Sequence, residues 1–229
     1  FQRKSIDGLG DNWPITYDEI KPWYDEVDRL IGIFGSNEGL HNHPDGIFLP
    51  PPTPRCWEHV VKRAADRQGV TCIPSRLSII TRPHNGRPGC HYCGQCNRGC
   101  AVNANFSSTN VLIAPALRTG KLTLVTGAMA REVTTGTDGL AKSVVYIDTA
   151  TGEEREVSGR VIVLAASACE SARILLNSSS SRHPDGLANS SGVVGKYLTD
   201  TTGTDVGGFI PALVDQPRHN CDGVGGAHL

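Results

Sequence analysis

Residues 161–178 read VIVLAASACESARILLNS, and this stretch decides the fold class predicted for the chain. It opens with an uninterrupted apolar run, residues 161–166, and together with Arg160 before it this run has the length of a strand. Such a strand is covered on both faces, as in a parallel sheet flanked by helices. Apolar residues then recur over 169–177 at positions that favour a helix. The stretch therefore predicts a strand, a tight turn and a helix of an α/β domain.

The turn between these two elements consists only of small residues, Ala165 to Cys169. Bulky side chains would hold a ligand away from the backbone here. Small ones let a ligand approach the amide groups and the positive end of the helix. Two interpretations stay open from this segment alone: one wall of a nucleotide pocket, or close packing of strand on helix with no ligand.

Upstream of this unit the sequence predicts a series of short strands. Apolar and β-branched residues mark them at 122–125, 130–134, 144–148 and 154–157. Turn signals separate the later ones, including Asp138-Gly139 and Thr151-Gly152.

The N-terminal half predicts helices and loops. Thr16 and Glu19 have the spacing of a capping box, and Pro22 predicts a short turn before a helix that ends near Gly32. Residues 35–54 predict a long loop. Thr53-Pro54 opens a second helix, which ends at Gly69. Its predicted buried face comprises Trp57, Val60, Val61, Ala64 and Ala65. Short strands at 70–73 and 77–81 and a helix at 109–117 follow.

Composition excludes some partners. With 22 basic and 23 acidic residues the formal net charge is −1, which gives no reason to expect nucleic acid or an anionic membrane as a partner. No apolar run approaches the roughly 18 residues of a membrane span. The chain begins at Phe1 and its single methionine is Met129, so we expect an internal segment of a longer protein. Nothing in the sequence assigns a compartment.

Four stretches, taken in order, resemble the glucose–methanol–choline family of FAD-dependent oxidoreductases. Residues 161–178 resemble its second signature segment, and residues 122–133 resemble the strand pair that leads into its β-meander. Residues 7–20 resemble the stretch that enters the family's substrate-side region, and residues 189–200 resemble the family's turn of the pattern GLVGR-L-DH. Together these pieces span most of the chain.

The resemblance implies a mixed α/β fold made of two partial domains. Residues 110–205 would form part of a Rossmann-like FAD domain with a β-meander. Residues 1–109, including a Cys-rich loop at 82–105, would belong to a substrate-binding domain, to which residues 206–229 begin to return. The implied activity is oxidation of a CH–OH group of an alcohol, polyol or sugar by hydride transfer to flavin, with an external electron acceptor. The implied FAD-binding residues are Ala130 at the adenine edge, Ala165, Ala166, Ser167 and Glu170.

The chain also departs from the family pattern. Ser167 stands where the family usually has glycine, and Thr201 stands where it often has histidine. A G-x-G-x-x-G dinucleotide fingerprint is absent, because Gly8-Leu-Gly10 continues with Asp-Asn-Trp. None of the eight histidines has the context of the family's catalytic base, so we assign no catalytic residue.

A cysteine cluster needs its own explanation. Cys90, Cys93, Cys96 and Cys100 have the spacing C-x2-C-x2-C-x3-C, which suits four-thiolate iron–sulfur or zinc sites. Because Ala101, not proline, follows the last cysteine and no second motif exists, a ferredoxin-type cluster would need all four local thiolates or a distant one such as Cys72 or Cys56. An iron–sulfur cluster, structural zinc, and disulfides or free thiols all stay open. Two other functions also stay open: a small iron–sulfur or zinc module that binds a partner, and an inactive homologue.

Overall fold

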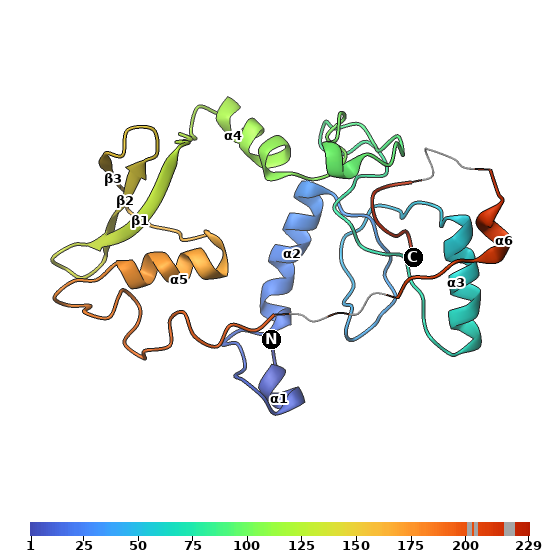
Figure 1. Cartoon of the computed structure of the whole chain (residues 1–229), viewed down its shortest axis with the longest axis horizontal. Coiled ribbons are helices and arrows are strands. Elements are labelled where there is room, and N and C mark those ends of the chain that lie inside the picture. Colours follow the sequence, from blue (N-terminus) through green and yellow to red (C-terminus); the bar gives the residue numbers. More distant parts are fainter. Residues whose placement is uncertain (201–202, 204–205, 218–222) are drawn as a thin grey trace. The chain divides into compact units, whose positions relative to one another are not determined.

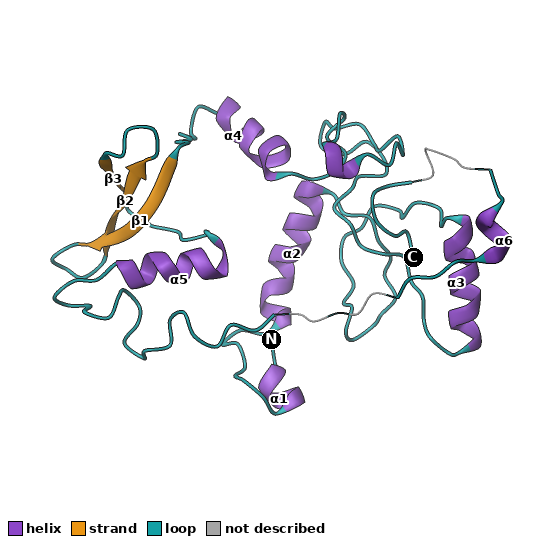
Figure 2. Cartoon of the chain, viewed as in Figure 1, coloured by secondary structure: helices purple, strands orange, loops and turns teal. Residues whose placement is uncertain are grey.

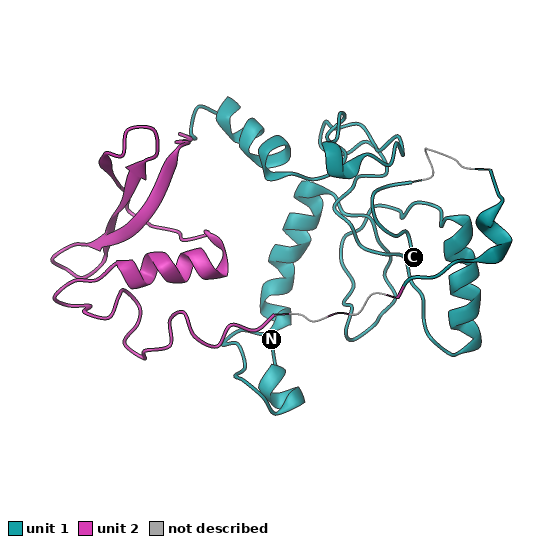
Figure 3. Ribbon diagram, in the orientation of Figure 1, with its two compact units in different colours: residues 1–122, 207–229 teal, residues 123–206 magenta. Residues whose placement is uncertain are grey.

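The computed structural model describes residues 1–200, 203, 206–217 and 223–229, and its elements are shown in Figures 1 and 2. The helices are α1 (Arg3–Asp7), α2 (Tyr17–Ile31), α3 (Cys56–Arg67), α4 (Ala114–Arg118), α5 (Ser167–Asn177) and α6 (Pro211–Val214), with a 3-10 turn η1 (Cys96–Arg98) and a π-helical turn η2 (Thr109–Ile113). The strands are β1 (Ala128–Thr135), β2 (Ala141–Asp148) and β3 (Glu154–Ser158). Two compact units result: unit 1 comprises residues 1–122 and 207–229, and unit 2 comprises residues 123–206 (Figure 3).

Unit 2 contains an antiparallel meander of strand order β1-β2-β3. Its register pairs Val133 with Val144 across the first hairpin, and a bulge lies between Ala130 and Glu132. Gly139 and Gly152 adopt positive φ angles of 81° and 74° in the two connecting turns, as their turn signals predict. The strands predicted at 130–134, 144–148 and 154–157 are therefore confirmed. The strand predicted at 122–125 is not formed.

Helix α5 packs on β1 and closes the small core of unit 2. Val133, Val145 and Ile174 are each almost fully buried. The hydroxyl of Ser178, buried at the end of α5, accepts a hydrogen bond from the Val133 N–H (2.8 Å) and donates one to the Ile174 carbonyl (2.6 Å). This hydroxyl ties the C-terminal end of the helix to the middle of the strand.

The strand predicted at residues 160–166 is absent from the described structure. The segment stays irregular, and Val161 and Val163 are each 79% exposed. A buried parallel strand needs neighbouring strands to satisfy its backbone. No described strand of this chain pairs with the segment. The mixed helix-and-strand class is confirmed, whereas the parallel sheet is not found among the described residues.

Unit 1 is built around a core with little regular structure. Its buried residues are Phe34, Leu49, Ile79, Ile80, Ala104 and Val224. Phe34 forms isolated bridges with Leu49 and Leu77, so the strand predicted at 77–81 shrinks to single bridges. The strand predicted at 70–73 is not formed. Residues of the Cys-rich loop pack against this core.

Helix α2 begins with the predicted capping box. The Thr16 hydroxyl accepts a hydrogen bond from the Glu19 N–H (3.3 Å), and the Glu19 carboxylate accepts one from the Thr16 N–H (2.7 Å). The predicted break at Pro22 is wrong, because the helix runs through it. Pro22 lies near the start of the helix, where proline removes one hydrogen bond without breaking the turn before it.

Helix α3 buries a residue that its apolar pattern does not indicate. Trp57 and Val61 are 40% and 46% exposed, whereas Glu58 is 1% exposed. The predicted buried face is therefore wrong. We define residues 223–229 as the C-terminal strap. This strap packs against α3 and contacts it through polar backbone groups.

The C-terminal strap is held by hydrogen bonds to its peptide groups. The Arg55 guanidinium donates to the carbonyls of Val224 (2.5 Å) and Gly226 (2.6 Å), and the Glu58 carboxylate accepts from the His228 N–H (2.6 Å). The Ser75 N–H donates to the His228 carbonyl (3.0 Å). These contacts place the strap firmly in unit 1.

Candidate functional site

The first turn of α5 is open to a ligand. Its N-cap, Ala166, supplies no side-chain hydrogen bond, and both Ala165 and Ser167 are exposed. The N–H groups at the start of a helix are unsatisfied and carry partial positive charge. The Ala166 N–H donates to the Ser171 hydroxyl (3.3 Å), whereas no side chain among the described residues caps the next amides of the first turn of α5, which can face an anionic or polar group. The predicted small-residue turn is thus accessible as expected.

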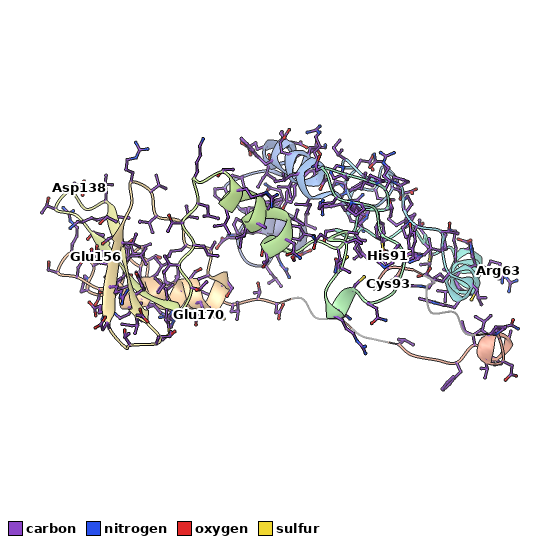
Figure 4. All side chains as sticks on the ribbon, turned by 90° about the horizontal axis from the view of Figure 1, so that it is seen from above. Arg63, His91, Cys93, Asp138, Glu156 and Glu170 are labelled. Atoms are coloured by element: carbon purple, nitrogen blue, oxygen red, sulfur yellow. The ribbon has the colours of Figure 1, made fainter. Side chains whose placement is uncertain are left out.

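Arg173 connects two of the predicted site residues. Its Nε donates to the Glu170 carboxylate (2.8 Å), and its terminal nitrogen donates to the Ala130 carbonyl (2.9 Å). Glu170 is labelled on α5 in Figure 4. The structure therefore brings Ala130, Glu170 and the turn at 165–167 into one unit. Sequence reasoning missed Arg173, although its position three residues after Glu170 on a helix was a usable signal.

A pocket of about 650 Å³ lies along α5. Its charged lining residues are both cationic, Arg173 and Lys196. Alanine and leucine residues of α5 and residues 195–199 form much of the remaining wall. Pockets of this size bind cofactor-sized groups, and the charge of the lining favours an anionic one.

Ser167 adopts a φ angle of +69°, a conformation that favours glycine. We expect Ser167→Gly to raise the free energy of unfolding of unit 2 by about 0.5–1 kcal/mol, because the relief of left-handed strain exceeds the entropy cost of glycine. Ser171→Gly, the same exchange inside α5 at a negative φ, should instead lower it, because glycine costs entropy there and the Ala166 N–H loses its acceptor. Urea unfolding of both variants checks the sign, and a destabilised Ser167→Gly would contradict this assignment of strain.

The Cys-rich loop directs backbone N–H groups at its sulfur atoms. Cys90 Sγ accepts from the Tyr92 N–H (3.3 Å), Cys96 Sγ from the Gly225 N–H (3.1 Å), and Cys100 Sγ from the Asn105 N–H (3.4 Å). His91 and Cys93 lie in the same loop in Figure 4. The contact with Gly225 joins this loop to the C-terminal strap.

Two of these thiols have shifted pKa values in opposite directions. Burial raises the pKa of Cys90, and its cysteine neighbours raise it further. Burial would also raise the pKa of Cys100, but several backbone N–H groups, first that of Asn105, outweigh burial and lower it. Cys100 therefore forms a thiolate more readily than Cys90 does.

The predicted metal ligands are not gathered into a metal site as placed. Within the described ranges, no group of three or more His, Cys, Asp or Glu side chains is arranged to hold a metal ion. The seven cysteines described are all free thiols, and Cys221 lies outside the described residues. The assignment of Cys90, Cys93, Cys96 and Cys100 as ligands stays a prediction.

His228, which the sequence could not assign, has a structural place. Its Nε2 accepts a hydrogen bond from the Val224 N–H (3.2 Å), so its Nδ1 carries the proton and donates to the Thr53 carbonyl (2.6 Å). The residue is 1% exposed. Both ring nitrogens are thus occupied in holding the C-terminal strap.

Comparison with known proteins decides the family. The family model described as GMC oxidoreductase matches residues 14–202, which is most of the chain. The chain belongs to the GMC oxidoreductase family. The match covers all the stretches that carried the resemblance except the first residues of the earliest one.

The relatives similar to this chain are dehydrogenases and oxidases by their names. It is 37% identical over 82% of its length to 2-methyl-1,2-propanediol dehydrogenase of Mycolicibacterium austroafricanum, of which it covers 34%. It is 31% identical over 90% of its length to paromamine 6'-oxidase of Streptomyces fradiae, of which it covers 37%. Fructose dehydrogenase large subunit of Gluconobacter japonicus is 25% identical over 89% of the chain, which covers 38% of it. The chain thus spans little more than a third of the length of these relatives.

The GMC assignment removes one of the alternatives. A small iron–sulfur or zinc module is not supported, because the family match extends over both units.

Among the described residues, no helix is both long and apolar enough to cross a bilayer.

Proposed function

We propose that this protein oxidises a CH–OH group of an alcohol, polyol or sugar, and that unit 2 forms part of its FAD site. The observation that carries the proposal is the uncapped N-terminus of α5, preceded by small residues and lying beside β1 in a GMC oxidoreductase. The names of the relatives support the substrate class. When bound, a flavin supplies the acceptor for a hydride from the alcohol carbon.

The residues of unit 2 fit a dinucleotide. Ala165 and Ala166 leave room for close approach to the backbone, and the α5 amides offer donors to its polar groups. Arg173 neutralises Glu170, so the first turn of α5 does not repel an anion. The Ala130 carbonyl has a second lone pair available beside the one that Arg173 occupies. In this proposal Ala130 contacts the adenine edge, and residues 165–167 and Glu170 line the cofactor.

The Rossmann-like arrangement belongs to the same proposal. Residues 161–165 are all apolar, and every second one is exposed, as expected of a strand that lacks its neighbours. We infer that they pair with strands of the FAD domain in the complete enzyme. An external electron acceptor completes the reaction.

Replacing Ala165 by leucine tests the FAD site. The larger side chain would hold the cofactor away from the α5 amides, so FAD affinity should fall at least about tenfold. Quenching of flavin fluorescence on titration into the flavin-free protein measures the dissociation constant. Leucine is tolerated sterically because position 165 is exposed.

Ala150→Leu is the matched control. Ala150 is exposed in the turn between β2 and β3, and the exchange adds the same apolar surface to the same unit. It should leave FAD affinity unchanged. Equal affinity of Ala165→Leu and wild type would remove residues 165–167 from the cofactor site.

We also retain a metal at the four cysteines of the Cys-rich loop as a proposal. The N–H groups that point at three of the sulfurs support it, because such donors stabilise thiolates. The side chains as placed do not form a ligand group, so no step of the reaction is derived through a metal. Iron, zinc and sulfide analysis of anaerobically purified protein tests the site. Protein free of all three would leave the cysteines as structural thiols.

A further inference from the structure

A second pocket, of about 520 Å³, lies wholly within unit 1, and the proposed FAD function makes no use of it. Its walls come from α2, from the loop at residues 44–48, and from single residues near 76 and 106. Its aromatic lining residues are Tyr17, Tyr24, Phe48 and Phe106. The rings of Tyr17 and Tyr24 lie 6.1 Å apart, tilted by 31°. Aromatic faces of this kind stack against the C–H faces of small ring ligands.

Charged groups are set among these rings. Asp25, Asp28 and Asp45 line the pocket together with Arg76. Lys21 neutralises Asp25 (Nζ to Oδ2, 2.9 Å). Among the described residues, no cationic side chain lies within ion-pair distance of the other two carboxylates.

The pocket therefore holds two unpaired carboxylates for one guanidinium. Arg76 binds neutral carbonyls, those of Pro44 (2.6 Å) and His43 (3.2 Å), and stacks over Phe48 (4.4 Å from Cζ to the ring centre). Its Nε is buried and has no hydrogen-bond partner among the described residues. A buried donor without a partner costs free energy, so this N–H indicates a missing acceptor.

Asp28 is the carboxylate best placed to meet a ligand. One oxygen accepts the Ile47 N–H (3.1 Å), and no described group is recorded as donating to the other. Burial raises the pKa of Asp28, and nearby Asp25 raises it too, against the Ile47 hydrogen bond and the weaker attraction of the Arg76 and Lys21 charges. A cation in the pocket would relieve that unfavourable burial of charge.

We propose that this pocket binds a small polyhydroxylated ligand that carries an amine, an amino sugar or amino polyol. Its ring would stack on Tyr24, its ammonium would pair with Asp28, and a hydroxyl would accept the free Arg76 N–H. This inference goes beyond the proposed oxidoreductase function. It involves no flavin, so flavin-free protein is sufficient to test it, and FAD binding is measured separately.

NMR titration with glucosamine and with glucose provides the test. Wild-type protein should bind glucosamine at least about fivefold more tightly than glucose, because only glucosamine forms the charged contact with Asp28. Asp28→Asn should bring the two affinities together while keeping an acceptor for the Ile47 N–H. Tyr24→Ala should weaken binding of both sugars.

Asp66→Asn is the control, because Asp66 is exposed on α3 and its exchange removes one negative charge from the same unit. It should keep the preference for glucosamine, and circular dichroism verifies the fold of each variant. Equal binding of both sugars to wild type, or a preference that survives in Asp28→Asn, would show that Asp28 does not recognise an ammonium. If neither sugar binds wild type, the pocket is not a ligand site and the proposal fails whatever the variants do.

Discussion

Alanine at Glu58 should lower the free energy of unfolding of unit 1 by about 3–5 kcal/mol. The carboxylate is 1% exposed and accepts hydrogen bonds from the backbone N–H groups of Arg55 (2.6 Å) and His228 (2.6 Å). It also faces the Arg55 guanidinium at 3.4 Å. Removing it leaves two backbone donors without their acceptor and the largely buried Arg55 guanidinium without its anionic partner. Amide hydrogen exchange in α3 measures the loss locally.

Glu19→Ala is the natural comparison for Glu58→Ala. Glu19 has the same position in the first turn of α2, but its contacts are solvent-exposed. Its loss should cost about 1 kcal/mol, the usual value for a cap. Equal costs for the two variants would mean that burial of Glu58 contributes nothing to stability.

Glu58 also predicts how the stability of unit 1 depends on pH. Burial would raise its pKa, but the N–H groups of His228 and Arg55 outweigh burial and hold it below the ordinary value of 4.5. A carboxyl whose folded-state pKa is lowered contributes fully above its unfolded value. That contribution should be lost as pH falls from 4.5 through the folded-state pKa, and Glu58→Gln should flatten this part of the profile.

Gly32→Ala has the second large expected effect, a loss of about 2–5 kcal/mol in unit 1. Gly32 ends α2 at a φ of +74°, where a side chain is strained. A Cβ there would lie 2.4 Å from the Cγ2 atom of Ile80, which is fully buried. The variant combines backbone strain with a clash in the core, and urea unfolding measures the sum.

Gly69→Ala separates the two causes. Gly69 follows α3 with a similar φ of +69°, but a Cβ there would meet nothing within 4 Å. It should cost only the left-handed strain, about 1–2 kcal/mol. If Gly32→Ala costs no more than Gly69→Ala, the core around Ile80 is loose enough to accept a methyl group.

Local signals predicted the elements that are stabilised locally. The strands at 130–134, 144–148 and 154–157 carry apolar and β-branched residues and are joined by glycine turns, so neighbouring residues suffice to form them. The capping box at Thr16 is local in the same way. In contrast, a strand at 160–166 depends on partner strands that no local pattern specifies. The burial of Glu58 likewise depends on His228, a residue 170 positions away.

At the candidate cofactor site, too, local sequence predicted some features and not others. Small residues before a helix predicted a turn that a ligand could approach, and Ala165 and Ser167 are exposed there. That this turn binds a cofactor stays a prediction. The link from Glu170 through Arg173 to the Ala130 carbonyl depends on how α5 packs on β1, because Arg173 and Ala130 are 43 residues apart in sequence. The spacing of the four cysteines, however regular, did not specify where their sulfur atoms point, because backbone N–H groups and the C-terminal strap compete for them.

The C-terminal strap has a consequence for how the chain acquires its structure during synthesis. The hydrogen bond from Arg55 to the Gly226 carbonyl joins residues 171 positions apart, so it forms only after residue 226 has been made. In contrast, all the contacts within unit 2 are available once residue 206 has been made. As the polypeptide leaves the ribosome, the meander and its helix should assemble while the earlier half still lacks its closing segment. Residues 1–122 would thus become stable only after unit 2, although they are made before it, and would be exposed meanwhile to proteases and chaperones.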